Sequence, residues 1–480
     1  MLNLLFAIDH LVNDNLLGIF SRWRVENTQR WLRPLIIASV LLLSATLAFN
    51  VSPRLLILIP GLLLGIGVVL LFIRWPPLGL IALIGSIPIP INGPSGSNVT
   101  MALVAVLLVL WLLDMMVRQR EIKLPPSAPI RPLLILVLVA ILAFGVGQLP
   151  WYTFAQAAPM GAQLGGLAIF VLSAGAFLLV AQYVRDLRWL EWLTWIFLAL
   201  GGLYIAGRLA PGLGQFTNSL FDSATGSLFW TWLVALSFSQ AVFNRNLHPG
   251  WRVVVGSLTL ATLYVALTQG WAWNSGWIPP LVAVMISLWA AKPKLGLLIA
   301  FMGAIGAVTK LQKLIDLVMV GDNEYSLGTR LDAWAIVWEI SKVNPILGLG
   351  PANYYWYTPL FPIRGYAVRF NSHSQYVDLI AQTGFLGLAC FLWFFGATGW
   401  LGWQLRQRVP AGFARAYVYG ALGGLAGTLV AGALGDWVLP FFYNIGMAGF
   451  RASVLGWLFL GGLVALEQMY ASQRASESVN

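Results

Sequence analysis

The side chains best suited to chemistry in this sequence are an arginine and a histidine in one long polar stretch, residues 310–373. Arg330 carries a planar, permanently charged guanidinium, the kind of group that binds a diphosphate through paired hydrogen bonds. His373 is expected at the N-terminus of a helix, where the positive end of the helix dipole disfavours the imidazolium ion. The pair therefore predicts a site that binds an anion and accepts a proton.

Both residues also have a structural interpretation. Arg330 could extend to lipid phosphate groups, and His373 could be an ordinary packed histidine. The other two histidines, His10 and His248, fall in the N-terminal segment and in a link expected on the opposite side of the membrane. His373 is thus the only histidine expected on the side where residues 310–373 lie.

Three more arginines and one acid are expected on that side. Arg208 ends the apolar segment GGLYIAGR and precedes the polar string GQFTNS, which is typical of non-helical backbone at a membrane cavity. Arg364 and Arg369 could complete an anion clamp or simply face solvent and headgroups. Asp436 could orient His373, pair with an arginine, or be a capping or solvated residue.

Motifs for metal ligands are missing from this sequence. It has no HExxH, no DxD in the links expected outside, and no acids clustered with histidine, while Asp322 and Glu324 are typical of a solvated turn. The single cysteine, Cys390, lies in an apolar segment, so neither a disulfide nor a cysteine metal site is expected. We therefore expect neither a metal nor another cofactor.

Composition places these residues in a membrane. The chain has 480 residues, of which 59% are hydrophobic and only 9% are charged, more apolar side chains than a soluble core can bury. The net charge of +11 could indicate nucleic-acid binding, but Lys and Arg fall mostly in short links between apolar runs. The predicted fold class is an all-α polytopic membrane protein, with about 12–14 transmembrane helices and one large extracytoplasmic loop, that contacts lipids and no nucleic acid.

The apolar runs divide the chain into five parts. Residues 1–33 read as an amphipathic helix in the membrane plane rather than a cleaved signal peptide, so the chain is expected to be used entire. The other parts are membrane helices over 34–309, the loop over 310–373, membrane helices over 374–468 and a cytoplasmic tail over 469–480. The predicted spans, each of roughly twenty residues, are 34–50, 54–73, 75–92, 99–117, 132–148, 163–184, 189–207, 223–243, 253–268, 275–291, 295–309, 374–400, 415–436 and 448–467.

Charge in the links predicts the orientation. The links 93–98, 149–162 and 269–274 contain no Lys or Arg, as expected for the external side of a membrane. The alternate links are basic, with Arg74, Arg185, Arg188, Arg245, Arg252, Lys292, Lys294, Arg406 and Arg408 among their residues. Both termini are therefore expected in the cytoplasm and the 310–373 loop outside it.

Two local features are expected inside these parts. A short helix should run from Arg330 to about Val343, capped by Thr329, with Trp334 and Trp338 sharing the arginine's face at headgroup level. The second feature is a run of small residues at three- and four-residue spacing in the span 415–436, which lets neighbouring helices approach closely. Its glycines are Gly420, Gly423, Gly424, Gly427, Gly432 and Gly435.

An ordered pattern between two predicted spans resembles the O-antigen ligase and polymerase family of membrane glycan transferases. It consists of Arg330, Trp334, Trp338, Pro345, Gly348, Gly350 and His373. The resemblance implies that Arg330 holds the diphosphate of a polyprenyl-linked glycan donor and that His373 acts on an acceptor hydroxyl, so both count as catalytic. It also implies a bacterial cytoplasmic membrane with transfer on its outer face.

This chain departs from the family pattern in one place. Members often carry a Ser-Arg pair before the large loop, and that arginine is thought to join the diphosphate site. The corresponding region here reads TQGWAWNSGWIPP, without an arginine. Either Arg208 or one of Arg364 and Arg369 supplies the charge, or the chain is a divergent relative with altered activity.

The leading hypothesis is a metal-independent glycan ligase or polymerase. Its acceptor stays open between lipid A core, another glycan, a protein and a wall polymer. A transporter or lipid flippase is the first rival, although such folds place their sites near the bilayer midplane and contain repeats, and no internal repeat is found here. The second rival is a membrane protein of envelope assembly without catalytic activity.

Overall fold

The computed structural model describes residues 65–298 apart from 94–95, 122 and 223, residue 301, and residues 322–477. The chain divides into two units, residues 1–71 and 72–480, and the description below concerns the second. The amphipathic segment 1–33, the span 34–50 and most of the spans 54–73 and 295–309 lie outside the described residues.

The described residues form an all-α membrane protein, as predicted. Eight helices in the described part of the chain are long and apolar enough to cross a membrane, and shorter apolar helices accompany them. The long ones are α5 (Val99–Leu113) with its π-helical continuation η2 (Asp114–Gln119), α7 (Met160–Tyr183), α8 (Leu187–Leu209), α11 (Pro249–Thr268), α12 (Asn274–Ala291), α17 (Gln375–Arg408), α18 (Phe413–Leu434) and α19 (Phe450–Glu477). The shorter ones include α4 (Pro76–Ser86), α6 (Ile130–Val146) and α10 (Ser227–Phe243).

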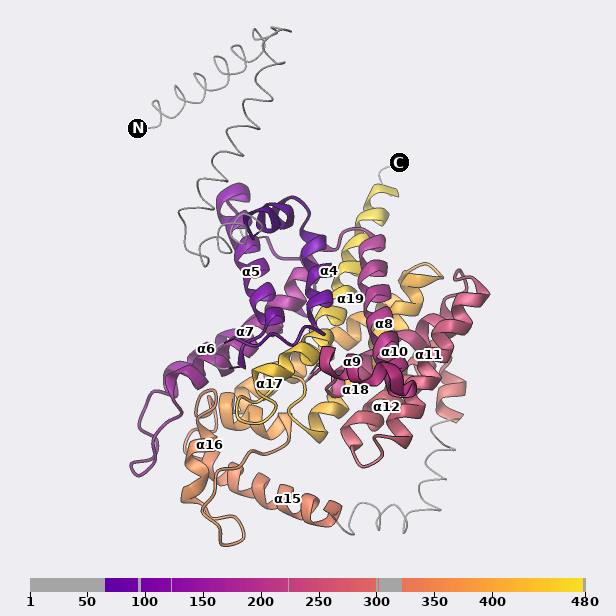
Figure 1. Cartoon of the computed structure of the whole chain (residues 1–480). Helices are drawn as coiled ribbons and strands as arrows, with labels where there is room; N and C mark the ends of the chain where they lie inside the picture. Colours follow the sequence, from indigo (N-terminus) through magenta and orange to yellow (C-terminus); the bar gives the residue numbers. More distant parts are fainter. Residues whose placement is uncertain are drawn as a thin grey trace, which may run out of the picture. The chain divides into compact units, whose positions relative to one another are not determined.

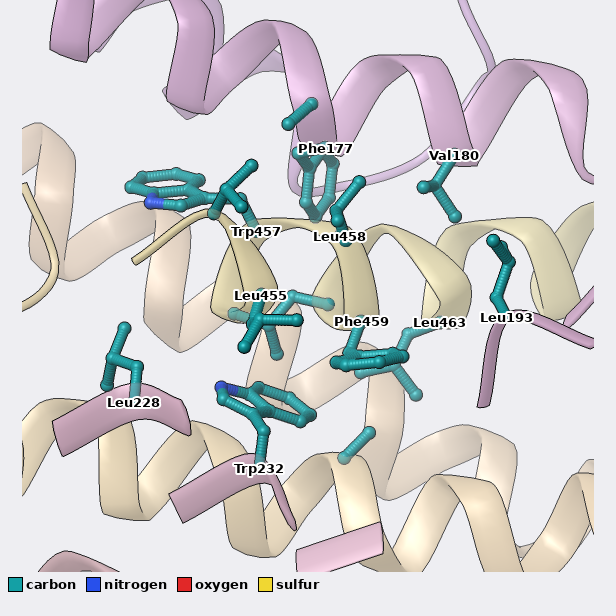
Figure 2. Close-up of a cluster of buried hydrophobic side chains, with 14 of the residues drawn as sticks. Phe177, Val180, Leu193, Leu228, Trp232, Leu455, Trp457, Leu458, Phe459 and Leu463 are labelled. Carbon is teal, nitrogen blue, oxygen red and sulfur yellow. The ribbon is translucent and has the colours of Figure 1, made fainter. Parts of the chain in front are cut away.

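The helix α19 forms the centre of the unit. Its membrane segment is entirely buried, which fits a helix that is apolar on every side. Figure 2 shows Trp457, Leu458 and Phe459 of α19 among side chains from three other helices. Those side chains are Phe177 and Val180 of α7, Leu193 of α8, and Leu228 and Trp232 of α10.

The glycine-rich helix is α18, and the expected close packing is observed. A Cβ atom on Gly423 would lie 2.2 Å from the carbonyl oxygen of Ala283 in α12, and one on Gly424 would lie 2.7 Å from the Trp232 ring in α10. The glycines therefore allow the backbone of α18 to approach two helices at distances that any side chain would prevent.

The described part of the loop, residues 322–373, begins with a longer helix than expected. The helix α15 (Asp322–Ser341) starts two turns before Arg330, so Thr329 lies inside it and does not cap it. The two short helices α16 (Tyr354–Tyr357) and η3 (Thr358–Leu360) follow, and Figure 1 shows α15 and α16 near the start of α17. Nothing in SLGTRLD stops a helix, because the run lacks proline and its one glycine costs only about 1 kcal/mol.

A kink in α17 receives the Pro-x-x-Gly-x-Gly segment of the loop. Gly384 has φ +67° and interrupts the helix, which continues to Arg408 instead of ending near residue 400. The amide of Leu349 donates to the carbonyl of Ala381 at 2.8 Å, and the amide of Gly350 donates to that of Gln382 at 3.0 Å. The loop is therefore anchored on the helix that follows it.

The links predicted to be external gather at one end of the helices. Asn98 Nδ2 donates to the carbonyl of Met447 at 2.8 Å, and Ser275 Oγ to that of Leu434 at 3.4 Å. Asn353 Nδ2 in the loop donates to the carbonyl of Gly147 at 3.0 Å. These bonds join five links or the helix ends beside them, in agreement with the alternation of charge. Which side of the membrane they face stays a prediction.

Candidate functional site

Arg330 and His373 line the same cavity. It has a volume of about 360 Å³ and lies between α15 and the segment that precedes α17. Its lining residues are Thr329, Arg330, Ala333, Ile363, Phe370, Asn371 and His373. The structure thus brings together the two side chains that the sequence singled out, although 42 residues separate them in the chain.

The guanidinium of Arg330 is half-buried and has capacity for an anion. Its Nη1 donates to the carbonyl of Leu434, at the end of α18, over a long 3.4 Å. Among the residues described, no carboxylate forms an ion pair with it. Burial lowers the pKa of Arg330, yet an arginine remains charged because its ordinary pKa exceeds 12. Its positive charge is therefore available to bind an anion in the cavity.

His373 is held as a neutral imidazole. Burial lowers its pKa most, and the nearby charge of Arg330 lowers it further. The sequence predicted neutrality from a helix dipole, whereas these two causes dominate in the structure. The backbone of His373 has φ +49°, a left-handed conformation that non-glycine residues seldom adopt and that histidine adopts more often than most.

Asp436 reaches His373 through an intervening amide. The carboxylate is fully buried, and its Oδ2 accepts the Phe441 amide at 2.7 Å. Its Oδ1 accepts a hydrogen bond from Asn444 Nδ2, and that amide group lies 3.4 Å from His373 Nδ1. Burial raises the pKa of Asp436. The predicted orienting acid therefore contacts Asn444 directly and the imidazole only indirectly.

The structure does not bring Arg208 into this cavity. Arg208 lines a separate cavity of about 250 Å³ together with Tyr204, Trp230 and Trp273. Its Nε donates to Gln269 Oε1 at 3.0 Å, and Gln269 returns a bond to the Arg208 carbonyl.

The prediction of non-helical backbone after Arg208 was wrong. The residues GQFTNS belong to the helix α9 (Pro211–Leu220), whose first residue is a proline. Proline at this position is already set for a helical φ, and Leu213, Phe216 and Leu220 supply an apolar face. The polar residues of GQFTNS therefore lie on the polar face of the amphipathic helix α9.

Arg364 and Arg369 lie near the cavity without lining it. Arg364 Nε donates to Asp332 Oδ2 of α15 at 2.7 Å, and both side chains are well exposed. The Arg369 guanidinium sits 3.7 Å from the centroid of the Trp356 ring, whose Nε1 donates to Tyr443 Oη at 2.8 Å. Both arginines thus have protein partners that an anion would have to share.

The tryptophan face of α15 differs from the expectation. Trp334 is half-buried, and its Nε1 donates to the carbonyl of Ser372 at 2.7 Å, so it holds the loop rather than lipid headgroups. Trp338 is 39% exposed, and its ring meets Phe385 edge-on. Trp334, the tryptophan nearer to Arg330 along α15, therefore holds the loop segment that carries His373.

Sequence reasoning missed four residues around His373. Tyr354, Ser372 and Asp378 form a buried hydrogen-bonded cluster beside it, and Asn444 contacts its ring. Asp378 carried a signal, since an ionisable residue inside a predicted span indicates function until shown otherwise. The other three are common polar residues in a loop, and only their position in space distinguishes them.

Comparison with known families finds a match in the region of the chain that contains this cavity. Residues 253–392 match the family model described as O-Antigen ligase, and no curated protein matches the sequence. The matched region runs from α11 to the middle of α17, so it contains Arg330 and His373 but neither Arg208 nor Asp436. All seven residues that carry the resemblance lie in the matched region, so the resemblance is confirmed for residues 253–392, which are similar to the O-antigen ligase family.

Proposed function

We propose that this protein transfers a glycan from a polyprenyl diphosphate to an acceptor hydroxyl at the outer face of the cytoplasmic membrane, as a ligase or polymerase. The observation that carries the proposal is the cavity shared by a neutral imidazole and a guanidinium without an ion-pair partner among the described residues. A diphosphate needs the cation, and a hydroxyl nucleophile needs the base.

The reaction assigns one task to each residue. The acceptor oxygen attacks the anomeric carbon of the donor glycan and loses its proton to His373. The bond between that carbon and the diphosphate oxygen breaks, and the electron pair leaves with the polyprenyl diphosphate. Arg330 stabilises the negative charge that grows on this leaving group. Such electrostatic stabilisation, aimed at charge that develops in the transition state, is usually the largest catalytic contribution.

Asn444 and Asp436 orient the imidazole. An amide can donate its NH₂ group to an unprotonated Nδ1 or accept a proton from Nδ1–H through its oxygen. Proton transfer from the acceptor uses the ring nitrogen that Asn444 does not engage. It therefore requires the second arrangement, in which the Asn444 amide is turned so that its oxygen, in place of Nδ2, faces both His373 Nδ1 and Asp436 Oδ1. A raised pKa of Asp436 supports it, because a protonated carboxyl group can donate to the amide oxygen.

Arg208 has a secondary role in this proposal. Its cavity combines one cation with the rings of Tyr204, Trp230 and Trp273, which suits the diphosphate of a lipid-linked donor before it reaches His373. Arg364 and Arg369 contribute positive charge near the site while bound to Asp332 and Trp356. They attract anionic donor or acceptor without contacting the reacting atoms.

Two substitutions test the proposal. His373→Ala and Arg330→Ala, introduced separately, should abolish transfer of glycan from a polyprenyl diphosphate donor by the purified protein in detergent, and should also remove the surface glycan in cells. His248→Ala and Arg118→Ala are matched controls, since both lie away from the cavity. Full transfer by either site variant at normal protein levels would overturn the assigned role. Activity in detergent also separates an enzyme from a transporter, because transport needs two compartments.

A further inference from the structure

Ser372, the residue before His373, forms hydrogen bonds through its amide, its carbonyl and its hydroxyl. We call Ser372 and its partners Tyr354 and Asp378 the clamp. The Ser372 amide donates to Tyr354 Oη at 3.2 Å, and its carbonyl accepts from Trp334 Nε1 at 2.7 Å. Its hydroxyl lies 2.7 Å from Asp378 Oδ1 and accepts the Ser374 amide at 3.1 Å. Ser372 is fully buried, and all of these bonds except the partly buried one from Trp334 are shielded from water. A serine in this position leaves its neighbour little freedom.

Asp378 is the common partner of this cluster. Its Oδ1 accepts hydrogen bonds from the hydroxyls of both Ser372 and Tyr354, and these two groups also bond to each other through the Ser372 amide. Asp378 lies in the first turn of α17, where the helix dipole favours a negative charge. One carboxylate therefore connects the start of α17, the helix α16 and the loop that carries His373.

The conformation of His373 explains what the clamp does. A histidine at φ +49° would relax toward negative φ if its neighbours were free, and that rotation would carry the ring away from Asn444. With Ser372 fixed on one side and the helix start at Gln375 on the other, the rotation is blocked. The ring orientation is thus set by groups that do not touch it.

Stability alone does not account for a carboxylate at this place. Asp378 is fully buried, and its Oδ2 has no hydrogen-bond partner among the described residues. Asp436 also lies close enough to interact with it electrostatically, so ionisation of both buried acids would be opposed by repulsion. An apolar residue would avoid both costs but would leave the Ser372 and Tyr354 hydroxyls without this partner, so the hydrogen bonds to these two residues are what the carboxylate provides.

We propose that Asp378 is the positioning residue of His373: through Ser372 and Tyr354 its buried carboxylate fixes the backbone conformation in which the imidazole faces the cavity. This inference rests on the proposed function for its effect on transfer. Its effect on the imidazole can be measured without any substrate.

The experiment uses a full-length protein in which His373 is the sole histidine, made by His10→Gln and His248→Gln. Diethyl pyrocarbonate modifies neutral imidazole, and its rate of reaction then reports on His373 alone. Ser372→Ala, Tyr354→Phe and Asp378→Asn are compared with Thr398→Ala, which removes another buried hydroxyl from the same helix α17, where it bonds only to the Phe394 carbonyl.

We expect each clamp variant to change the rate of modification severalfold and to lower kcat about tenfold to a hundredfold, with KM within about twofold. The control should match the parent in all three. Ser372→Ala should add almost nothing to Asp378→Asn, because both act through one contact. Tyr354→Phe removes a single hydroxyl and serves if Asp378→Asn fails to fold.

Three outcomes would each overturn one of these claims. If the clamp variants match Thr398→Ala in both modification rate and kcat, Asp378 is not a positioning residue. If they change the modification rate while transfer stays at the parent level, the clamp orients His373 as inferred and the catalytic role of His373 fails instead. A change in KM alone, with the modification rate unaltered, also contradicts the positioning role.

Discussion

Two cavities that are separate in the structure each contain an arginine, and they differ in what surrounds it. Arg208 shares its cavity with Gln269 and three aromatic rings, all on helices or their ends. Arg330 shares its cavity with His373, behind which lie Asn444 and the buried Asp436. An arginine in an aromatic setting can hold an anion. Only the second setting adds a group that can take a proton.

The two cavities are also built differently. The Arg208 cavity is formed by residues of α8, α10, α11 and α12 and the adjoining links. The Arg330 cavity joins α15 to the segment before α17 and rests on the link 434–446, three stretches far apart in the chain. The Arg330 cavity thus forms where distant segments meet, whereas the Arg208 cavity arises between neighbouring helices.

The largest difference between the cavities should appear when the base is removed. His373→Asn keeps a residue that tolerates positive φ, so the backbone is preserved while the base is lost. We expect kcat for glycan transfer to fall about 100-fold to 10,000-fold, the range for a general base. No substitution at Arg208 should approach this loss, and transfer by His373→Asn within about threefold of wild type would remove the distinction.

Loss of the charge beside the base should have the next largest effect. Arg330→Gln removes the cation that stabilises the leaving diphosphate, and we expect kcat to fall about 100-fold. Arg330→Lys keeps the charge without the planar fork, and its kcat should lie between those of the wild type and Arg330→Gln. Steady-state kinetics with a lipid-linked donor distinguish them. A change confined to the donor KM would make Arg330 a second binding arginine, equivalent to Arg208.

The pH dependence links the two residues of the reaction cavity. Burial and Arg330 both lower the pKa of His373 below its ordinary value near 6.5. Activity should therefore be full above the lowered pKa of His373 and fall as pH drops through it. Arg330→Gln removes one cause and should move this acid limb to higher pH, whereas Arg208→Gln should leave it in place. Rate profiles of kcat for the three proteins, checked for stability at each pH, test the direction of the shift.

Arg208 itself should influence binding more than turnover. Arg208→Gln should raise the donor KM about threefold to tenfold with kcat within about twofold, because a cation outside the reaction cavity stabilises the bound donor and the transition state alike. Lys123→Ala, an exposed basic residue in another link, is the control for a general effect of charge. An equal fall in kcat would place Arg208 in the reaction itself.

The smallest effect is expected at the exposed ion pair near the reaction cavity. Arg364 and Asp332 are 39% and 47% exposed, and such pairs contribute roughly 0.2–1 kcal/mol to stability. Arg364→Ala should lower the free energy of unfolding by no more than about 1 kcal/mol and leave transfer within about twofold. Thermal unfolding in detergent with Arg364→Ala, Asp332→Ala and the double variant measures the coupling. A loss of transfer as large as that of Arg330→Gln would extend the reaction site to this arginine.

Much of the membrane architecture followed from the apolar runs. The spans expected at 163–184, 253–268, 275–291 and 415–436 correspond to α7, α11, α12 and α18 within a few residues, because apolar length fixes where a chain can cross a bilayer. The errors fall on segments of mixed polarity, namely α9 and the first two turns of α15. There local composition does not decide between helix and loop, and contacts with other helices do.

The sequence by itself determined which side chains were available: Arg330 and His373 in the long polar stretch, the glycines of α18, and the basic links that indicate orientation. Only the tertiary structure decided that Arg330 and His373 share a cavity while Arg208 has another, and that Asn444, Asp378 and Ser372 lie close to His373. Residue type and spacing along the chain constrain local geometry. The distances between α15, α16, the start of α17 and the link after α18 depend on how the helices pack against one another.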